Sequence, residues 1–182
     1  GFVRIAWEGV CVFCLGLCAE AVEGTAGEIT ANGGESTARV CDVSDEASVQ
    51  KTVQACVERY SRLDGLVNMA GILRFDDTQE LQTAHWQKVI DVNLTGTMFL
   101  CRSVLPHLVE TRGSIVNAAS TAALSGLPSG LAYSASKGGV LAMTRSIAVE
   151  YAKRGVRANR ISPGDIKTGL TVNIRHLLNK SP

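Results

Sequence analysis

Short runs of strand-forming residues alternate with stretches of helical periodicity along most of this chain, and that alternation restricts the folds it can adopt. The run Val10–Leu15 is continuously apolar, as expected of a strand covered on both faces. Further strands are predicted at 38–41, 66–68, 114–118 and 156–161. Because helical patterns separate these runs, the strands should pair in parallel through crossover connections.

The segments between the strands carry the helical signals. Apolar and small residues recur at helical spacing from 22 to 29, and a second stripe from 49 to 60 follows Ser44, the expected N-cap residue. Two longer helices are predicted at about 86–108 and 132–153. The pattern predicts a single α/β domain, a three-layer α/β/α Rossmann-like doubly wound parallel sheet of at least five strands. Such sheets bind ligands beyond the C-terminal ends of their strands.

Composition limits the partners of this domain. Of its 182 residues, 46% are hydrophobic and 19% are charged, and the formal net charge is +1. That charge gives no electrostatic reason to expect nucleic acid or an anionic membrane as a partner. The apolar stretch from Val10 to Ala19 is too short to span a bilayer, and no charged segment with a cleavage site precedes it. We therefore expect a cytoplasmic protein that acts on a small molecule.

Six cysteines leave two interpretations open. Cys11, Cys14 and Cys18 are close enough in sequence to suggest a metal cluster, and the other three are Cys41, Cys56 and Cys101. The histidines lie far away, at 85, 107 and 176, and most of the cysteines fall within apolar segments. Reduced, buried thiols are therefore favoured, and no metal is expected.

Tyr133 and Lys137 form the most informative pair of side chains. They are four residues apart at the start of a predicted helix, so they share one helix face. A free tyrosine has a pKa near 10, and an ammonium group within about 4–6 Å favours its phenolate form. The pair therefore predicts a tyrosine that can act as a general acid/base. Taken alone, the spacing is also compatible with a solvated lysine beside a half-buried tyrosine.

The surrounding motifs strengthen the catalytic interpretation. Ser120 follows the strand at 114–118, on the rim where such sheets bind ligands, and a hydroxyl there can hydrogen-bond the same substrate oxygen. Asn68-Met69-Ala70-Gly71 follows the preceding strand, Asp91–Gly96 lies within the first long helix, and Ile161-Ser162-Pro163-Gly164 closes the last strand.

In this order and spacing, these motifs resemble the short-chain dehydrogenase/reductase family over residues 8–171. The resemblance implies an NAD(P)-dependent oxidoreductase whose catalytic set is Asn93, Ser120, Tyr133 and Lys137. The cofactor-binding residues that it implies are Asp42, Val43, Asn68, Ala70, Gly71, Tyr133, Lys137, Pro163, Gly164, Ile166 and Thr168. Asp42 would contact the adenine, and the last two residues would hold the nicotinamide end. The resemblance also implies a homo-oligomer, a dimer or tetramer, acting on an alcohol or ketone.

The chain departs from the family pattern at several positions. The family's first strand and glycine-rich turn, which hold the cofactor pyrophosphate, do not precede Val10, and its last strand does not follow Ile161. We therefore expect a domain truncated at both ends, 1–182, with a vacant position between the strands at 10–15 and 66–68. Gly16 stands where the family has an acid for the adenosine ribose, and Met69 replaces its second asparagine. Since no cation neighbours Gly16 in sequence, NAD is preferred, with NADP left open.

Two alternative functions remain. Ser134-Ala135-Ser136-Lys137 and Lys167-Thr168-Gly169 match two parts of the penicillin-recognising serine hydrolase signature, but its third part does not occur between them. The other alternative is a dehydrogenase-like protein that binds partners without catalysing, which the incomplete cofactor site favours. A complete Ser120, Tyr133 and Lys137 set favours catalysis.

Overall fold

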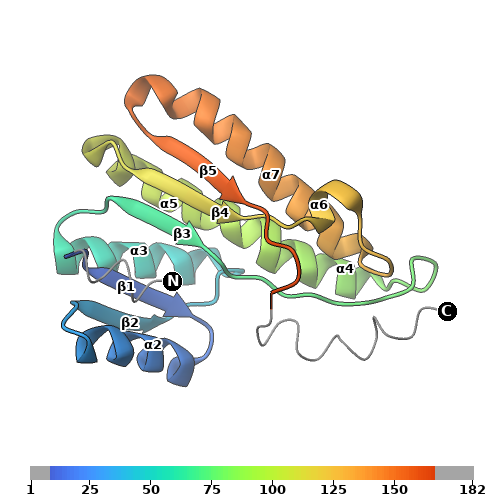
Figure 1. The fold of residues 1–182 in the computed structure, drawn as a ribbon, viewed down its shortest axis with the longest axis horizontal. Coiled ribbons are helices and arrows are strands. Elements are labelled where there is room, and N and C mark those ends of the chain that lie inside the picture. The colour runs from blue at the N-terminus through green and yellow to red at the C-terminus, as the bar shows by residue number, and fades with distance from the viewer. Residues whose placement is uncertain (1–8, 167–182) are drawn as a thin grey trace.

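Five strands form the central layer of the computed structural model, which describes residues 9–166 (Figure 1). They are β1 (Val12–Gly16), β2 (Ser36–Val40), β3 (Gly65–Asn68), β4 (Ser114–Ala118) and β5 (Arg157–Ile161). β1 pairs with β2, and β4 lies between β3 and β5, with every pair parallel. The predicted Rossmann-like α/β fold is confirmed.

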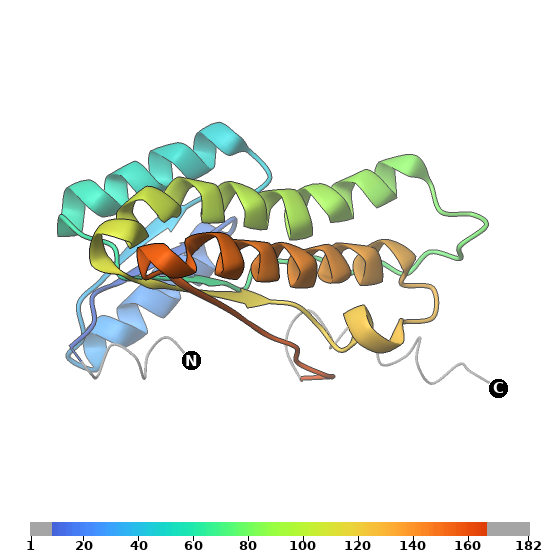
Figure 2. The same cartoon turned by 90° about the horizontal axis from the view of Figure 1, so that it is seen from above.

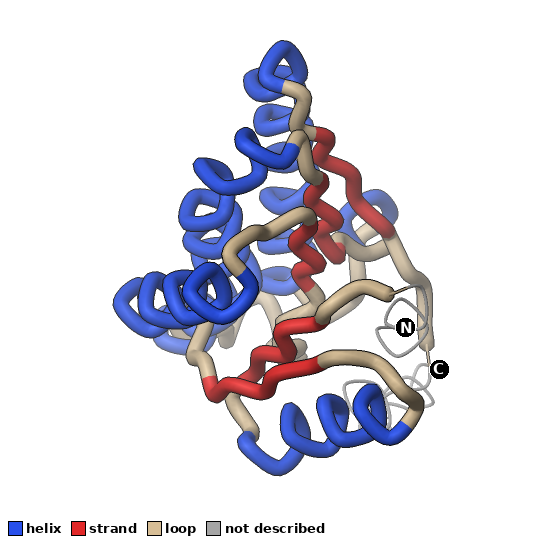
Figure 3. Tube along the Cα trace, turned by 90° about the vertical axis from the view of Figure 1, so that its left-hand side faces the viewer, coloured by secondary structure: helices blue, strands red, loops and turns tan. Residues whose placement is uncertain are grey.

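The strands form two hydrogen-bonded groups, with the interruption that was expected between β1 and β3. Hydrogen bonds join β1 and β2 into one sheet and β3, β4 and β5 into another, and within residues 9–166 no strand connects β1 to β3 (Figure 3). The vacancy expected between these two strands is present in the described part of the chain. A ladder requires strands about 4.8 Å apart, and the alternation of elements alone does not specify which strands are that close.

Helices cover the strands on both sides. α3 (Glu46–Tyr60), α5 (Gly96–Thr111) and α7 (Leu131–Tyr151) lie on one side, and α5 and α7 run side by side along the molecule (Figures 1 and 2). α2 (Ala19–Ala31) packs on β1 and β2 from the other side (Figure 3). The short helix α6 (Ala122–Ser125) packs against α7.

The sequence predicted one continuous helix over about 86–108, but the structure shows an interrupted one. It consists of α4 (Thr83–Ile90), a π-helical segment at Asp91–Thr95, and α5. A π-helical turn inserts a residue into the helical register and is frequent at functional sites. Here it carries the fully buried Asn93.

The N-cap of α3 is also one residue later than predicted. The Asp45 carboxylate accepts a hydrogen bond from the backbone N–H of Ala47, 2.9 Å away, and so caps the helix. Ser44 instead donates both its backbone N–H and its hydroxyl to Asp42. Both residues are common N-caps, so sequence preference did not separate them.

The main core lies between the strands β3 and β4 and the helices α3, α5 and α7. Val49, Val104, Leu108, Ile115 and Val156 are among its almost fully buried members. A smaller cluster of Cys14, Ala26 and Ile29 joins β1 to α2. The apolar residues that pattern analysis assigned to the core faces are therefore largely the residues that pack there.

The six cysteines are all free thiols. Cys14, Cys41 and Cys101 are buried, but Cys11 and Cys18 are exposed, contrary to the expectation that the thiols would mostly be buried. Among residues 9–166 no cluster of side chains could hold a metal ion. Over the same residues, no helix is both long and apolar enough to cross a bilayer.

Candidate active site

The polar residues predicted from the sequence gather where β3, β4 and β5 end. The segment after β4 is bound to the segment after β5 by two backbone hydrogen bonds, from Ala119 N to Ile161 O at 2.9 Å and from Thr121 N to Pro163 O at 3.1 Å. Ser120 lies between the two donors. The structure therefore places the Pro163-Gly164 turn directly beside the predicted catalytic serine.

Ser120 itself is half-buried at the start of α6. Its Oγ accepts a hydrogen bond from the backbone N–H of Ala122 at 3.2 Å. A hydroxyl that accepts from the backbone in this way keeps its own proton available for another acceptor. Ser120 can therefore donate a hydrogen bond to a substrate oxygen.

Tyr133 and Lys137 occupy the first two turns of α7 and are both buried, with exposed fractions of 8% and 4%. The Lys137 Nζ donates to the carbonyl oxygen of Ala118, at the end of β4, over 2.7 Å. It lies 5.8 Å from the centroid of the Tyr133 ring, so the predicted pairing of ammonium and phenol is present. Desolvation by burial lowers the pKa of Lys137 from its usual value of 10.5 to about 8.

Asn93 joins the π-helical segment to the loop after β3. Its Oδ1 accepts from the backbone N–H of Ile72 at 2.8 Å, and its Nδ2 donates to the carbonyl of the same residue at 2.9 Å. Nδ2 also donates to Ser136 Oγ at 3.0 Å, and Ser136 donates in turn to the carbonyl of Tyr133 at 2.7 Å. Two residues of the predicted set, Asn93 and Tyr133, are thus linked through Ser136 on α7.

Ser136 was not predicted as a site residue. It is fully buried, and it connects the amide of Asn93 to the backbone of Tyr133. A serine inside a helix commonly bonds to a preceding carbonyl, so only the contact with Asn93, distant in sequence, distinguishes it.

Gly71 lies against the same group of side chains. A Cβ atom at this position would stand 3.3 Å from Asn93 Oδ1 and 3.4 Å from Lys137 Nζ. The bare Cα therefore leaves space beside the buried ammonium, where a bound molecule can approach it. Ala70, the preceding residue, is exposed at the end of the loop.

Asp42 and Val43 lie apart from this cluster, beyond the end of β2. Hydrogen bonds from the Ser44 hydroxyl at 2.6 Å and the Ser44 backbone N–H at 2.9 Å lower the pKa of the Asp42 carboxyl. Val43 is buried against the start of α5. A Cβ on Gly96, the first residue of α5, would stand 2.8 Å from the carbonyl oxygen of Val43. Asp42 is therefore a fixed, ionised acceptor, and the roles of both residues in cofactor binding stay predictions.

Asn68 differs most from its predicted role. Its side chain is 5% exposed and points into the core, where Nδ2 donates to Asn117 Oδ1 at 2.8 Å. Asn117 in turn donates to Thr144 on α7 at 2.9 Å. The amide of Asn68 thus ties two strands together, and only its backbone is left to line a cofactor site. Of the two residues predicted at the nicotinamide end, Ile166 is exposed and Thr168 lies outside the described residues.

The geometry does not fit the serine hydrolase alternative. Lys137 donates to a backbone carbonyl of β4, and the buried Ser134 Oγ has no hydrogen-bond partner among the described residues. A serine nucleophile needs a base within hydrogen-bonding reach. What the site does offer is a buried phenol, a buried ammonium and a hydroxyl on adjoining elements.

Residues 3–179 match the family model of the short chain dehydrogenases. This chain belongs to that family. A 3-oxoacyl-[acyl-carrier-protein] reductase from Synechocystis sp. is 39% identical over 156 residues, which are 85% of this chain and 63% of that protein. The chain thus spans less than two thirds of the length of this curated relative.

Solved structures give the same result. NAD+-bound xylitol dehydrogenase superposes with a TM-score of 0.88 at 33% identity, over 92% of this chain and 65% of that one. Actinorhodin polyketide ketoreductase with NADPH superposes with a TM-score of 0.93 at 34% identity, over 98% of this chain and 69% of that one. The two neighbours carry different nicotinamide cofactors, so likeness to them supports such a cofactor without selecting one.

Proposed function

We propose that this protein is an oxidoreductase that transfers a hydride between a nicotinamide cofactor and a carbonyl or alcohol substrate, with Tyr133 as general acid/base. The observation that carries the proposal is the burial of Lys137 beside the Tyr133 ring, at the carboxyl ends of the strands. Burying a charged lysine is costly. A cost of this kind is typical of positions where the charge is needed for function.

The environment of Lys137 fits a bound cofactor. An ammonium group has three N–H donors, and among the described residues only the Ala118 carbonyl accepts a hydrogen bond from it. The hydroxyl groups of a ribose can accept from the remaining donors. Gly71 leaves the space for them, since it lacks the Cβ that would stand 3.4 Å from Nζ. A nicotinamide cofactor bound there supplies the hydride acceptor for oxidation or the hydride donor for reduction.

The protein's own groups manage the proton. When an alcohol is oxidised, its hydroxyl proton has to leave as the carbon loses hydride, and Tyr133 takes that proton on its phenol oxygen. Ser120 donates a hydrogen bond to the same substrate oxygen while its charge changes. The Lys137 ammonium lies beside the Tyr133 ring, and the Asn93–Ser136 chain holds the backbone of Tyr133 in place.

We further propose that the cofactor lies along the strand ends, with Asp42 and Val43 at its adenine and the Pro163–Ile166 segment at its nicotinamide. NAD is preferred over NADP, because Gly16, Leu17 and Cys18 at the end of β1 carry no positive charge for a 2′-phosphate. Tighter binding of NADPH than of NADH in parallel titrations would overturn this preference.

We also propose a cytoplasmic homo-oligomer, a dimer or a tetramer. The six free thiols fit a reducing compartment, and the exposed residues Ala135 and Ala142 on α7 are small enough for close helix packing. A monomer in light scattering at micromolar concentration would contradict the oligomer.

A second candidate is a protein that keeps the dehydrogenase fold without catalysing. Titration with NADH and NADPH, followed by turnover assays on a panel of ketones and secondary alcohols, separates the two. The proposed function predicts both cofactor binding and turnover. Binding of neither cofactor, or binding without turnover of any carbonyl or alcohol, would support the second candidate.

A further inference from the structure

Asp76, outside the catalytic set, is bound to two other parts of the chain. His85 on α4 donates from Nδ1 to Asp76 Oδ1 at 2.9 Å, and Arg74 Nε lies 3.4 Å from Oδ2. The backbone N–H of Asp76 donates to the carbonyl of Ser129 at 2.9 Å. The loop after β3 is therefore held to α4 by a side chain and to the loop before α7 by its backbone.

Ser129 belongs to a tight turn that leads directly into α7. The turn runs from Leu127 to Gly130, whose N–H donates to the Leu127 carbonyl at 2.9 Å. Pro128 holds its second position, and Ser129 holds the third with a φ of 55°, a conformation that favours glycine. Tyr133 follows three residues after the turn. A serine kept in this conformation indicates that neighbouring contacts hold the turn in shape.

The other end of the β3–α4 loop is also fixed. Ile72 is bound through both backbone groups to the buried Asn93. Leu73, Arg74 and Phe75 therefore form a three-residue segment tethered at Ile72 to one catalytic element and at Asp76 to the entrance of another. Leu73 and Phe75 are half-buried apolar residues within it.

We propose that the Asp76–His85 pair is a positioning device that sets the size of the substrate, by holding the Leu73–Phe75 segment against the α6–α7 loop. The inference rests on the proposed function, because it concerns the substrate side of the same site. The Asp76–Ser129 hydrogen bond joins the two segments, and Tyr133 lies four residues after Ser129 in α7. When both ends of the Leu73–Phe75 segment are held, the segment keeps one conformation and excludes bulky substrates. When the Asp76–His85 hydrogen bond is lost, the segment can move and admit them.

Asp76 positions the loop through the hydrogen bonds of its carboxylate, and not through its charge alone. Asp76 is 18% exposed and His85 is 28% exposed, so their hydrogen bond is sheltered from solvent, unlike the exposed ion pair of Arg62 and Asp64. Exposed pairs contribute little to holding a loop. His85 is thus the partner through which α4 fixes the position of Asp76.

His85→Phe tests the inference, because it keeps an aromatic ring at this position and removes the Nδ1 donor to Asp76. The matched control is Asp77→Asn, since the neighbouring carboxylate accepts only the backbone N–H of Gln79 and is exposed. Isopropanol and cyclooctanol serve as a small and a bulky substrate, with whichever cofactor the parent binds. His85→Phe should raise kcat/KM for cyclooctanol relative to isopropanol by at least about threefold, leaving cofactor affinity unchanged. It should also speed amide hydrogen exchange in both 72–77 and 127–130.

The outcomes separate this inference from the proposed function. Suppose that the parent oxidises alcohols and that His85→Phe has the same ratio of kcat/KM for cyclooctanol to isopropanol as the control. This result would overturn the positioning role, even if amide exchange were faster. Unchanged exchange in both segments would overturn the tether itself. A parent that binds cofactor but oxidises neither alcohol nor reduces the matching ketones would instead count against the proposed function.

Discussion

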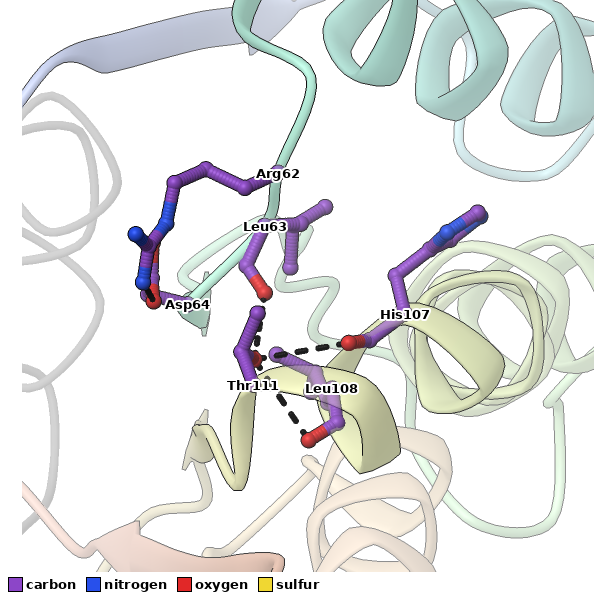
Figure 4. Close-up of polar contacts among 6 residues, drawn as sticks. All are labelled: Arg62, Leu63, Asp64, His107, Leu108 and Thr111. Carbon is purple, nitrogen blue, oxygen red and sulfur yellow. Dashed lines mark hydrogen bonds and ion pairs between the residues drawn. The ribbon is translucent and has the colours of Figure 1, made fainter.

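The two ends of the β3–β4–β5 sheet differ in how they satisfy their polar groups. At the amino ends, Thr111 Oγ1 donates to the Leu63 carbonyl at 2.8 Å and also lies near the carbonyls of His107 and Leu108 (Figure 4). There the loop before β3 and the end of α5 close on each other through backbone groups. At the carboxyl ends, Lys137 is buried with one acceptor, and Asn68 Oδ1 has no hydrogen-bond partner among the described residues.

This difference shows which end serves stability and which serves chemistry. Polar groups at the amino ends are paired locally, so each contributes to the fold without needing a ligand. Polar groups at the carboxyl ends are buried and incompletely paired, and that costs stability unless a bound molecule completes them. Changes at the amino ends should therefore lower stability and spare chemistry, whereas changes at the carboxyl ends should impair chemistry and relieve the cost of the buried polar groups.

The largest expected effect on stability concerns Lys137→Met. The pKa of Lys137 is about 8 in the folded protein and 10.5 when exposed, so the unfolded chain binds the extra proton between these values. The parent's free energy of unfolding should therefore rise between pH 8 and 10.5, by roughly 3 kcal/mol relative to the variant. Below pH 8 the parent has no such gain in the free energy of unfolding, because Lys137 is protonated in both the folded and the unfolded protein. Denaturant unfolding of both proteins from pH 7 to pH 11 measures the difference, and parallel curves would contradict a buried cation at this end.

Gly113→Ala should have the next largest effect, at the opposite end. A Cβ at Gly113 would stand 2.5 Å from the Asp64 carbonyl oxygen and 2.6 Å from Leu108 Cδ2, so the loop and the helix end have to separate. We expect a loss of about 2 kcal/mol in the free energy of unfolding, with cofactor binding retained. Gly27→Ala on α2 is the control, because nothing lies within 4 Å of its Cβ position. If Gly113→Ala and Gly27→Ala both have the parent's free energy of unfolding, the close packing of Gly113 against Asp64 and Leu108 would be contradicted.

Thr111→Val should have a smaller effect in the same place. The change preserves the side-chain shape and removes the donor to the Leu63 carbonyl, which should cost about 1 kcal/mol. Thr25→Val on α2 serves for comparison, since its hydroxyl bonds only within its own helix, to Ala21. Thr111→Val should have a lower thermal unfolding midpoint than Thr25→Val. Equal midpoints would contradict a stabilising hydrogen bond from Thr111 to the Leu63 carbonyl.

The sequence predicted β4 with the correct bounds, Ser114–Ala118, because the β-branched pair Ile115-Val116 follows the flanking Gly113. It also identified Tyr133, Lys137 and Asn93, whose spacing is local or matches a family motif. It missed the π-helical segment at Asp91–Thr95, since an inserted residue in a helix leaves little trace in periodicity. The break between β1 and β3 was predicted, because the family's first strand does not precede Val10.

Other misses share a physical cause. Asn68 stays a prediction on the cofactor side, and the bond from its amide to Asn117 was not foreseen because the direction of a side chain at a strand end depends on its neighbours. Ser136 and the Asp76–His85 pair act through contacts between residues far apart in sequence or in different elements. Sequence patterns therefore predicted the candidate catalytic residues, and the structure revealed the contacts that support them.

The hydride-transfer rate of Tyr133→Phe tests the central claim most directly, measured in a single turnover so that product release does not mask chemistry. The change removes one hydroxyl from a buried ring at the carboxyl ends of the strands. The account predicts a fall of at least about 100-fold, with cofactor affinity and the unfolding midpoint close to the parent's. A variant that keeps more than about a tenth of the parent's rate would show that the proton leaves by another route.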